Sequence, residues 1–130
     1  MVIDSSAIVA LLLREPDADD VAGAIDEAPV LRVSAATLVE TSIVMTRRRG
    51  EAGVVAVDHL LLSVGVAVDA VTRAQARTAR EAYIRFGKGR HPAALNFGDC
   101  FSYALAKHKG EPLLCLGEDF ARTDIRLALR

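Results

Sequence analysis

The sequence predicts an α/β fold in which helices pack on a central parallel sheet. Short apolar or β-branched runs alternate along the chain with longer amphipathic segments, which is the pattern of strand–helix–strand units. Hydrophobic residues make up 52% of the chain and charged residues 25%, so the composition is that of a globular protein with a core. A length of 130 residues suits one domain spanning residues 1–130.

Each element follows from local signals. Ser34 is placed to cap the third helix, and Thr72 with Gln75 resembles a capping box before the fifth. Residues 87–97 are rich in Gly and Pro and predict a loop, and residues 123–129 have room for a short edge strand. The expected strands are residues 1–4, 31–33, 66–68 and 112–116, and the expected helices are 5–13, 17–27, 34–48, 51–62, 72–86 and 99–109.

Several protein classes do not fit this chain. The longest apolar stretch, residues 60–68, is too short to cross a membrane, and no signal peptide pattern precedes the first helix. We therefore expect a cytoplasmic protein without membrane contact. Cys100 and Cys115 have no zinc-ligand spacing and are expected to be buried thiols. The net charge of −1 argues against a uniformly basic nucleic-acid binder.

Two aspartates stand where a parallel sheet places its ligands, and a third begins a helix. Asp4 follows the first strand and Asp119 follows the strand near residue 113, so both fall at the carboxyl edge of the sheet. Asp99 begins a helix after a loop that contains polar Asn96. Each has an ordinary alternative, because Asp is a favoured helix cap and a favoured turn residue.

Glu40 is harder to explain as a structural residue. Val39, Ile43 and Ala36 lie beside it at helical spacing, which predicts that Glu40 lies on a core-facing apolar stripe. A carboxylate there is unfavourable unless it is paired or holds a metal. An arginine partner is the alternative, but Arg47 belongs to an exposed run of three arginines.

Together the four acids predict a metal site. Carboxylates that converge repel one another by about 4 kcal/mol per pair at 4 Å and an effective dielectric near 20, and a divalent cation removes that repulsion. Oxygen ligands select Mg²⁺, with Mn²⁺ as a possible substitute. Such sites serve phosphoryl chemistry. The expected metal ligands and catalytic residues are Asp4, Glu40, Asp99 and Asp119.

Basic residues cluster despite the modest net charge. Arg85, Lys88, Arg90 and His91 lead toward Asp99, and we expect Arg90 and His91 to contact RNA phosphates. Two further arginine clusters, residues 47–49 and 73–80, are equally well explained as solvated faces. His91 is also the candidate for a metal-free acid–base mechanism.

Other reaction classes find less support. Ser5 and Ser6 follow Asp4 without a nucleophile elbow, so Ser6 is expected to hydrogen-bond a metal ligand or its water. No glycine-rich phosphate loop is present. An aspartyl-phosphate phosphatase would require a second Asp two residues after Asp4, where Ser6 stands.

Four stretches of the chain match a known family. The sequence resembles PIN-domain ribonucleases, specifically the VapC toxins of bacterial toxin–antitoxin pairs. The resemblance covers essentially the whole chain in order. The matching stretches are VIDSSA at residues 2–7, LVETS at 38–42, LNFGDCFSYALAK at 95–107 and LLCLGEDFARTDI at 113–125.

The resemblance implies a parallel sheet in an α/β/α sandwich and a metal-dependent endoribonuclease. It implies an acidic quartet at Asp4, Glu40, Asp99 and Asp119, with Asp4 and Asp99 as magnesium ligands. It places Ser6 at a family hydroxyl position and Asn96 and Thr123 at polar positions beside the site, and we expect these three residues to bind substrate together with Arg90 and His91.

The function predicted from the sequence is a Mg²⁺-dependent toxin that cuts structured RNA, either tRNA or rRNA, to inhibit translation. The resemblance further implies a homodimer and a small antitoxin that blocks the active-site groove. The alternative is a catalytically idle PIN-like module that only binds a partner protein.

Overall fold

The computed structural model describes residues 1–129 and has the predicted α/β architecture. Four parallel strands form one sheet in the order β3-β2-β1-β4. The strands are β1 (Val2–Ile3), β2 (Arg32–Ser34), β3 (Ala67–Asp69) and β4 (Leu113–Leu114). The helices are α1 (Ser5–Leu13), α2 (Ala18–Glu27), α3 (Ala35–Arg49), α4 (Glu51–Ser63), α5 (Arg73–Phe86), α6 (Phe97–Lys109) and the 3₁₀ helix η1 (Phe120–Arg122).

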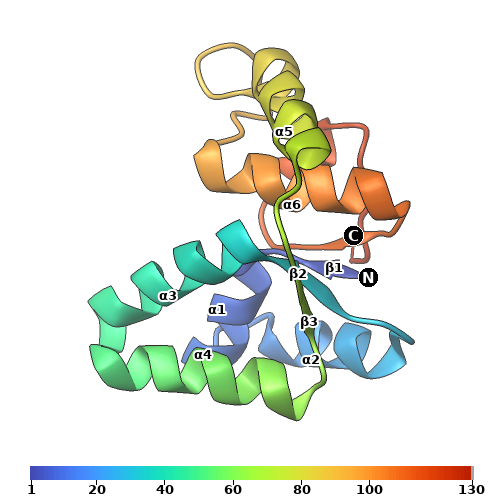
Figure 1. Ribbon diagram of the computed structural model, residues 1–130. Coiled ribbons are helices and arrows are strands. Elements are labelled where there is room, and N and C mark those ends of the chain that lie inside the picture. The colour runs from blue at the N-terminus through green and yellow to red at the C-terminus, as the bar shows by residue number, and fades with distance from the viewer. Residues whose placement is uncertain (130) are drawn as a thin grey trace.

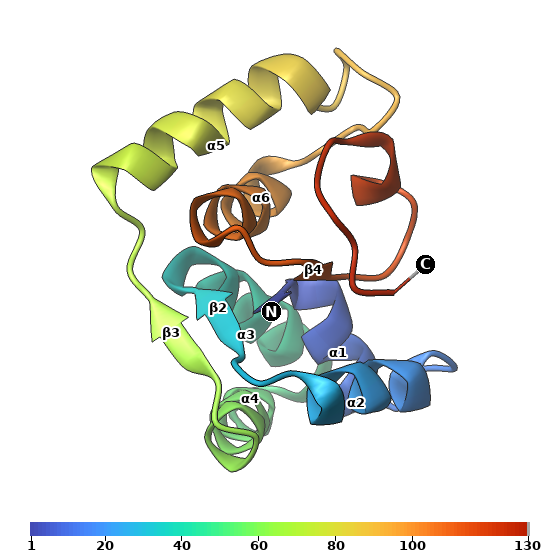
Figure 2. The same ribbon diagram turned by 90° about the vertical axis from the view of Figure 1, so that its right-hand side faces the viewer.

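Helices cover both faces of the sheet (Figures 1 and 2). α6 lies on one face against β1, β2 and β4, and α5 packs on its outer side. α1, α2, α3 and α4 lie on the other face, where α3 and α4 form an antiparallel pair. The α/β/α sandwich implied by the family resemblance is therefore confirmed.

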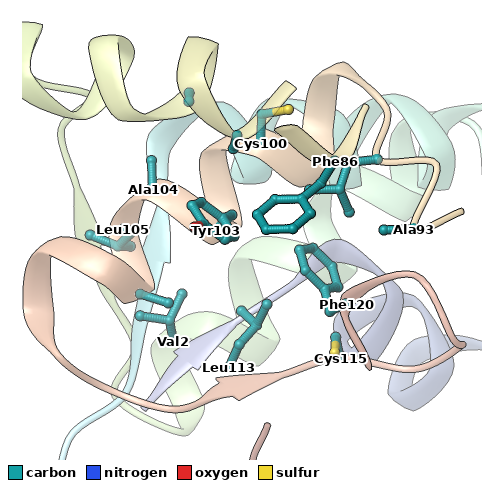
Figure 3. Packing of buried hydrophobic residues seen from close by; sticks show 14 residues of the cluster. Val2, Phe86, Ala93, Cys100, Tyr103, Ala104, Leu105, Leu113, Cys115 and Phe120 are labelled. Carbon is teal, nitrogen blue, oxygen red and sulfur yellow. The ribbon is translucent and has the colours of Figure 1, made fainter. Parts of the chain in front are cut away.

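The core is divided into two clusters by the alternation of side chains along the strands. Val2 and Leu113 point toward α6, whereas Ile3 and Leu114 point toward α1 and α4. The α6 side contains the aromatic rings shown in Figure 3, among which Phe86 and Tyr103 lie 5.9 Å apart between centroids. The other side is aliphatic.

Parallel pairing brings the ends of β1 and β4 to the same edge of the sheet. Val2 pairs with Leu113 and Ile3 with Leu114. The amide of Asp4 then donates to the carbonyl of Leu114 at 2.9 Å. The residues that follow both strands consequently share one edge, as the sequence predicts.

Two predicted boundaries were wrong at this edge. The strand expected at residues 112–116 is only Leu113–Leu114, because the Leu116 amide bonds to the Ser6 hydroxyl instead of a neighbouring strand. α6 begins at Phe97 and not at Asp99, because Asn96 is its cap. The other strands and helices lie within one residue of their expected bounds.

Two further expectations need correction. Thr72 caps α5 by accepting from the Gln75 amide at 3.1 Å, but the capping box, with both bonds present, is at α6. The tail does not form a strand within the described residues. Leu127 instead makes a single parallel bridge to Leu113. No helix among residues 1–129 combines the length and the apolar character needed to cross a membrane.

Candidate metal centre and active site

Asp4 caps α1 and is also one of the four acids of the candidate site. Its side chain is buried, with 3% exposure, and Oδ2 accepts hydrogen bonds from the amide of Ser6 at 3.0 Å and from the Ser6 hydroxyl at 2.7 Å. The Ser6 hydroxyl accepts in turn from the amide of Leu116 at 3.1 Å. The expected bond from Ser6 to an acidic residue is thus present, and it ties the end of β1 to the segment after β4.

A second hydroxyl network, which the sequence interpretation missed, holds the other oxygen of Asp4. Ser102 on α6 donates to Asp4 Oδ1 at 2.6 Å, and the hydroxyl of Thr37 on α3 lies 3.1 Å from that of Ser102. Both hydroxyl residues are fully buried. A serine three residues after Asp99, inside a run of apolar residues, was the available signal.

Asp99 lies in the first turn of α6 and is 8% exposed. Its Oδ2 accepts from the Asn96 amide and its own amide donates to Asn96 Oδ1, both at 2.9 Å. The pKa of Asp99 is raised to about 7, chiefly because burial disfavours the charged form. Negative charge on Asp4, Glu40 and Asp119 contributes to this rise in pKa, which places all four acids within electrostatic reach.

Glu40 is half-buried, but the reason predicted for its burial was wrong. Val39 and Ile43 are 58% and 49% exposed, so the stripe beside Glu40 faces outward and not into the core. The core-facing residues of α3 are Thr37, Thr41 and Met45. Glu40 is covered from another direction, because its carboxylate lies against Gly98 at the start of α6.

The environment of Glu40 is unfavourable for a lone anion. Its Oε2 atom is buried and has no hydrogen-bond partner among residues 1–129. Burial is the main cause that raises the pKa of Glu40, and the charge of Asp4 raises this pKa further, while the hydroxyl of Ser5 opposes the shift. A buried carboxylate oxygen without a hydrogen-bond partner can instead be stabilised by coordinating a cation.

Asp119 completes the cluster from the segment after β4. It precedes η1, is exposed and makes no side-chain capping bond. Its charge acts on Asp99 and on the thiol of Cys115. It is thus the member of the cluster nearest to solvent.

The four acids share one region, but they do not form a finished metal cage. Within the part of the chain that the structure describes, no three His, Cys, Asp or Glu side chains are grouped so as to hold a metal ion. Asp4 and Asp99 are engaged by hydroxyl and amide donors. The oxygen-only donor set and the unsatisfied oxygen of Glu40 nevertheless fit a hard divalent cation.

Arg90 and His91, the basic residues predicted to contact RNA, lie in the loop of residues 87–96 and hydrogen-bond within that region. Arg90 is exposed, and its Nε donates to the carbonyl of Ile84 at 3.1 Å. His91 accepts from the Ala93 amide through Nδ1 at 3.0 Å, and its ring meets Phe86 edge-on. Loop 87–96 and η1 lie side by side in Figure 2. They are joined by a hydrogen bond of 3.4 Å from the guanidinium of Arg122 to the carbonyl of Pro92.

Thr123 and the remaining arginines have roles or positions outside the acid cluster. The hydroxyl of Thr123 donates to the carbonyl of Phe120 at 2.8 Å and accepts from the amide of Ile125, which shapes the turn after η1. Arg85 lies 3.6 Å from Asp124. The arginines of residues 47–49 and those at 73, 77 and 80 are exposed, as both a solvated face and a phosphate-binding face require.

Neither cysteine is suited to act as a nucleophile. Cys100 and Cys115 are both free and buried. Burial is the main cause that raises the pKa of Cys100 to about 11 and that of Cys115 to about 12. Both thiols are therefore protonated near pH 7 and act as small core residues, as expected.

Comparisons with known proteins agree with this fold. The PIN domain family matches residues 1–126. Ribonuclease VapC of Mycolicibacterium smegmatis is 54% identical over 125 residues, which cover 96% of this chain and 97% of that protein.

Solved structures agree on the fold. The crystal structure of VapC20 from Mycobacterium tuberculosis, described as a sarcin–ricin loop cleaving toxin, has a TM-score of 0.79 at 24% identity and covers 95% of both chains. A toxin–antitoxin complex from Klebsiella pneumoniae has a TM-score of 0.69 at 15% identity and covers 95% of this chain and 92% of its own. The family match and the close relative show that the chain belongs to the PIN-domain family, among its VapC ribonucleases.

Proposed function

We propose that the protein is a Mg²⁺-dependent endoribonuclease toxin that cuts structured RNA, tRNA or rRNA, and thereby inhibits translation. The observation that carries the proposal is that four acids lie within electrostatic reach of one another near the carboxyl edge of the sheet, and that Glu40 Oε2 is buried with no hydrogen-bond partner among residues 1–129. A related fold, that of VapC20, belongs to a toxin described as cleaving the sarcin–ricin loop, which supports a structured RNA target.

The proposed metal ligands are Asp4, Glu40, Asp99 and Asp119. Mg²⁺, or Mn²⁺ in its place, would supply the activation of water and the stabilisation of the leaving oxygen in phosphodiester hydrolysis. Asp4 is oriented for this role by two hydroxyls, one on each of its oxygens. Asp99 can hold a proton near pH 7, because burial raises its pKa to about 7, and would release that proton when a cation binds.

The chain's own polar groups would hold the substrate. Ser6 and Asn96 keep Asp4 and Asp99 in place. Arg90 presents an exposed guanidinium from loop 87–96, and His91 lies beside it. We propose that these two residues contact the RNA backbone, with Ser6, Asn96 and Thr123 as further polar contacts to the substrate.

A protein partner is proposed for the same edge of the molecule. Val39, Ile43 and Phe97, which is 79% exposed, line the groove of about 370 Å³ that contains Glu40. Exposed apolar side chains next to an acidic site favour a protein that covers both. We propose a small antitoxin here, as the toxin–antitoxin complex of similar fold suggests, and a homodimer acting in the cytoplasm.

The test is cleavage of total bacterial RNA by the antitoxin-free full chain, with Mg²⁺ and with EDTA. Asp4→Asn and Asp99→Asn remove one charge each without changing shape, and Asp26→Asn, an exposed acid on α2, is the matched control. We expect discrete fragments only with Mg²⁺, no cleavage by the two site variants, and wild-type cleavage by the control. Cleavage that persists in EDTA would overturn the metal mechanism and direct attention to His91.

A further inference from the structure

Gly98 occupies a helical position where glycine is not required by the backbone. It is the second residue of α6, and its φ is not among the positive values found at other glycines. Glycine weakens a helix relative to alanine, because it loses more conformational freedom on folding. A glycine at this position therefore needs another explanation.

The explanation is that there is no room for a side chain at Gly98, beside the acidic cluster. A Cβ atom on Gly98 would collide with the carboxyl carbon and with both carboxyl oxygens of Glu40. The carboxylate thus lies directly on the backbone of the first turn of α6, one residue before Asp99. This is also the carboxylate whose Oε2 atom is buried without a hydrogen-bond partner among the described residues.

We propose that Gly98 is a positioning residue whose missing side chain lets the Glu40 carboxylate reach the divalent-cation site beside Asp99. The inference rests on the proposed function, because it assumes that Glu40 is a metal ligand. It adds a residue that acts through Glu40 and does not itself touch metal or substrate. At Gly98 the carboxylate of Glu40, on α3, meets the backbone of α6.

The collision would move a side chain and would leave the fold intact. The atoms that a methyl group at Gly98 would meet belong to the flexible end of Glu40, which can rotate into the adjoining groove lined by Val39 and Phe97. At Gly53, in contrast, the methyl group would meet the backbone carbonyl of Met45. The substitution Gly98→Ala is therefore expected to separate metal binding from stability.

The first experiment compares Gly98→Ala with Gly23→Ala in the antitoxin-free full chain. Gly23 lies on α2, and a Cβ there meets nothing within 4 Å, so it is the matched control. Mn²⁺ affinity is measured by calorimetry, and unfolding temperature is measured in EDTA. We expect about tenfold weaker Mn²⁺ binding for Gly98→Ala, as for other residues that orient metal ligands, and unchanged binding for Gly23→Ala. Neither variant should unfold at a lower temperature than the wild type.

The second experiment asks whether Gly98 acts through Glu40. Glu40→Asp withdraws the carboxylate by one methylene, so a methyl group at position 98 no longer meets it. Gly98→Ala should then weaken Mn²⁺ binding much less in the Glu40→Asp background than in the wild-type background. An equal loss in both backgrounds, no loss at all, or a lowered unfolding temperature in EDTA would overturn the inference.

Glu40→Gln separates this inference from the proposed function. If Glu40→Gln binds Mn²⁺ as tightly as the wild type, Glu40 is not a ligand, and both the proposed ligand set and this inference fail. If Glu40→Gln binds weakly while Gly98→Ala binds normally, the ligand set stands and the role of Gly98 fails. Weak binding by both variants supports the two together.

Discussion

Asp4 shows how one side chain can cap a helix and also belong to the proposed metal site. It caps α1, as its position after the first strand allows, and its two oxygens are fixed by Ser6 and Ser102. The capping alternative and the ligand alternative are therefore compatible for this residue. What distinguishes Asp4 from an ordinary cap is the buried hydroxyl of Ser102, 98 residues away in the chain.

Removing the Ser102 hydroxyl should affect both stability and catalysis. Ser102→Ala leaves Asp4 Oδ1 and the Thr37 hydroxyl without their buried partner, so we expect a loss of about 1–3 kcal/mol in the free energy of unfolding. We also expect a lower kcat with little change in KM, because RNA does not reach Ser102. Urea unfolding and steady-state cleavage measure the two effects.

An exposed serine is the control for this prediction. Ser63, at the end of α4, is exposed, and its hydroxyl donates to the carbonyl of Leu60. Ser63→Ala should change the free energy of unfolding by no more than about 0.5 kcal/mol and leave kcat unchanged. Equal effects of the two substitutions would contradict a special role for Ser102.

The pKa of Asp99 predicts a pH-dependent stability for the metal-free protein. Since burial raises its pKa from 3.8 to about 7, the folded state keeps a proton that the unfolded chain loses. The contribution of Asp99 is fully present below pH 3.8 and is lost as the pH rises to about 7. The free energy of unfolding in EDTA should thus fall between these values, by at most about 1.4 kcal/mol per pH unit.

Asp99→Asn isolates this contribution, because the amide has the same shape and does not titrate. Urea unfolding of the wild type and of the variant at several pH values between 4 and 8 should show a shallower fall for Asp99→Asn. Parallel curves for the two proteins would assign the pH dependence to other groups.

At the scale of the elements, α3 and α4 meet at a contact that only glycine permits. Gly53, near the start of α4, is buried, and a Cβ there would meet the backbone of Met45 on α3. Alanine would favour the helix by about 1 kcal/mol, but the two helices would have to move apart. We expect Gly53→Ala to lower the free energy of unfolding by about 1–3 kcal/mol, as overpacked cores do.

Gly23→Ala again provides the comparison, now for stability. A methyl group at Gly23 enters open space on an exposed face of α2, so the helix preference of alanine acts alone. Thermal unfolding should show opposite shifts for the two variants. A stabilised Gly53→Ala would mean that α3 and α4 are more loosely packed than the structure indicates.

The whole molecule brings the four acids together from four separate segments, so cation binding should stabilise the entire fold. A ligand that binds only the folded state adds stability that grows with its concentration, about 2.7 kcal/mol at 100 times Kd. We expect Mn²⁺ to raise the unfolding temperature, and more at pH 8 than at pH 6, because burial raises the pKa of Asp99 to about 7 and the cation must displace its proton.

Thermal unfolding with and without Mn²⁺, at matched ionic strength, checks this expectation. Glu40→Gln and Asp99→Asn should gain less from Mn²⁺ than the wild type, whereas the surface variant Asp26→Asn should gain as much. An equal gain in all four proteins would show that the cation acts elsewhere on the molecule.

Much of the fold could be predicted from local signals alone. The order of strands and helices was predicted from signals that involve only neighbouring residues. These signals are the caps at Ser34 and Thr72, the glycines after helices and the short apolar strands. The same signals place Asp4 and Asp119 after parallel strands, at one edge of the sheet. The short β4 was missed because the Ser6 hydroxyl, from another part of the chain, accepts from the Leu116 amide. The early start of α6 was missed because Asn96 was not recognised as its cap.

The tertiary structure decided what surrounds each acid. Helical spacing predicted a core-facing Glu40, yet Val39 and Ile43 face outward, and Glu40 is covered by α6 instead. The bond from Ser102 to Asp4 and the space left by Gly98 join segments that are distant in the chain. Periodicity reports only which side of a helix is apolar, whereas the packing of α3 against α6 determines which carboxylates lose water and which stay exposed.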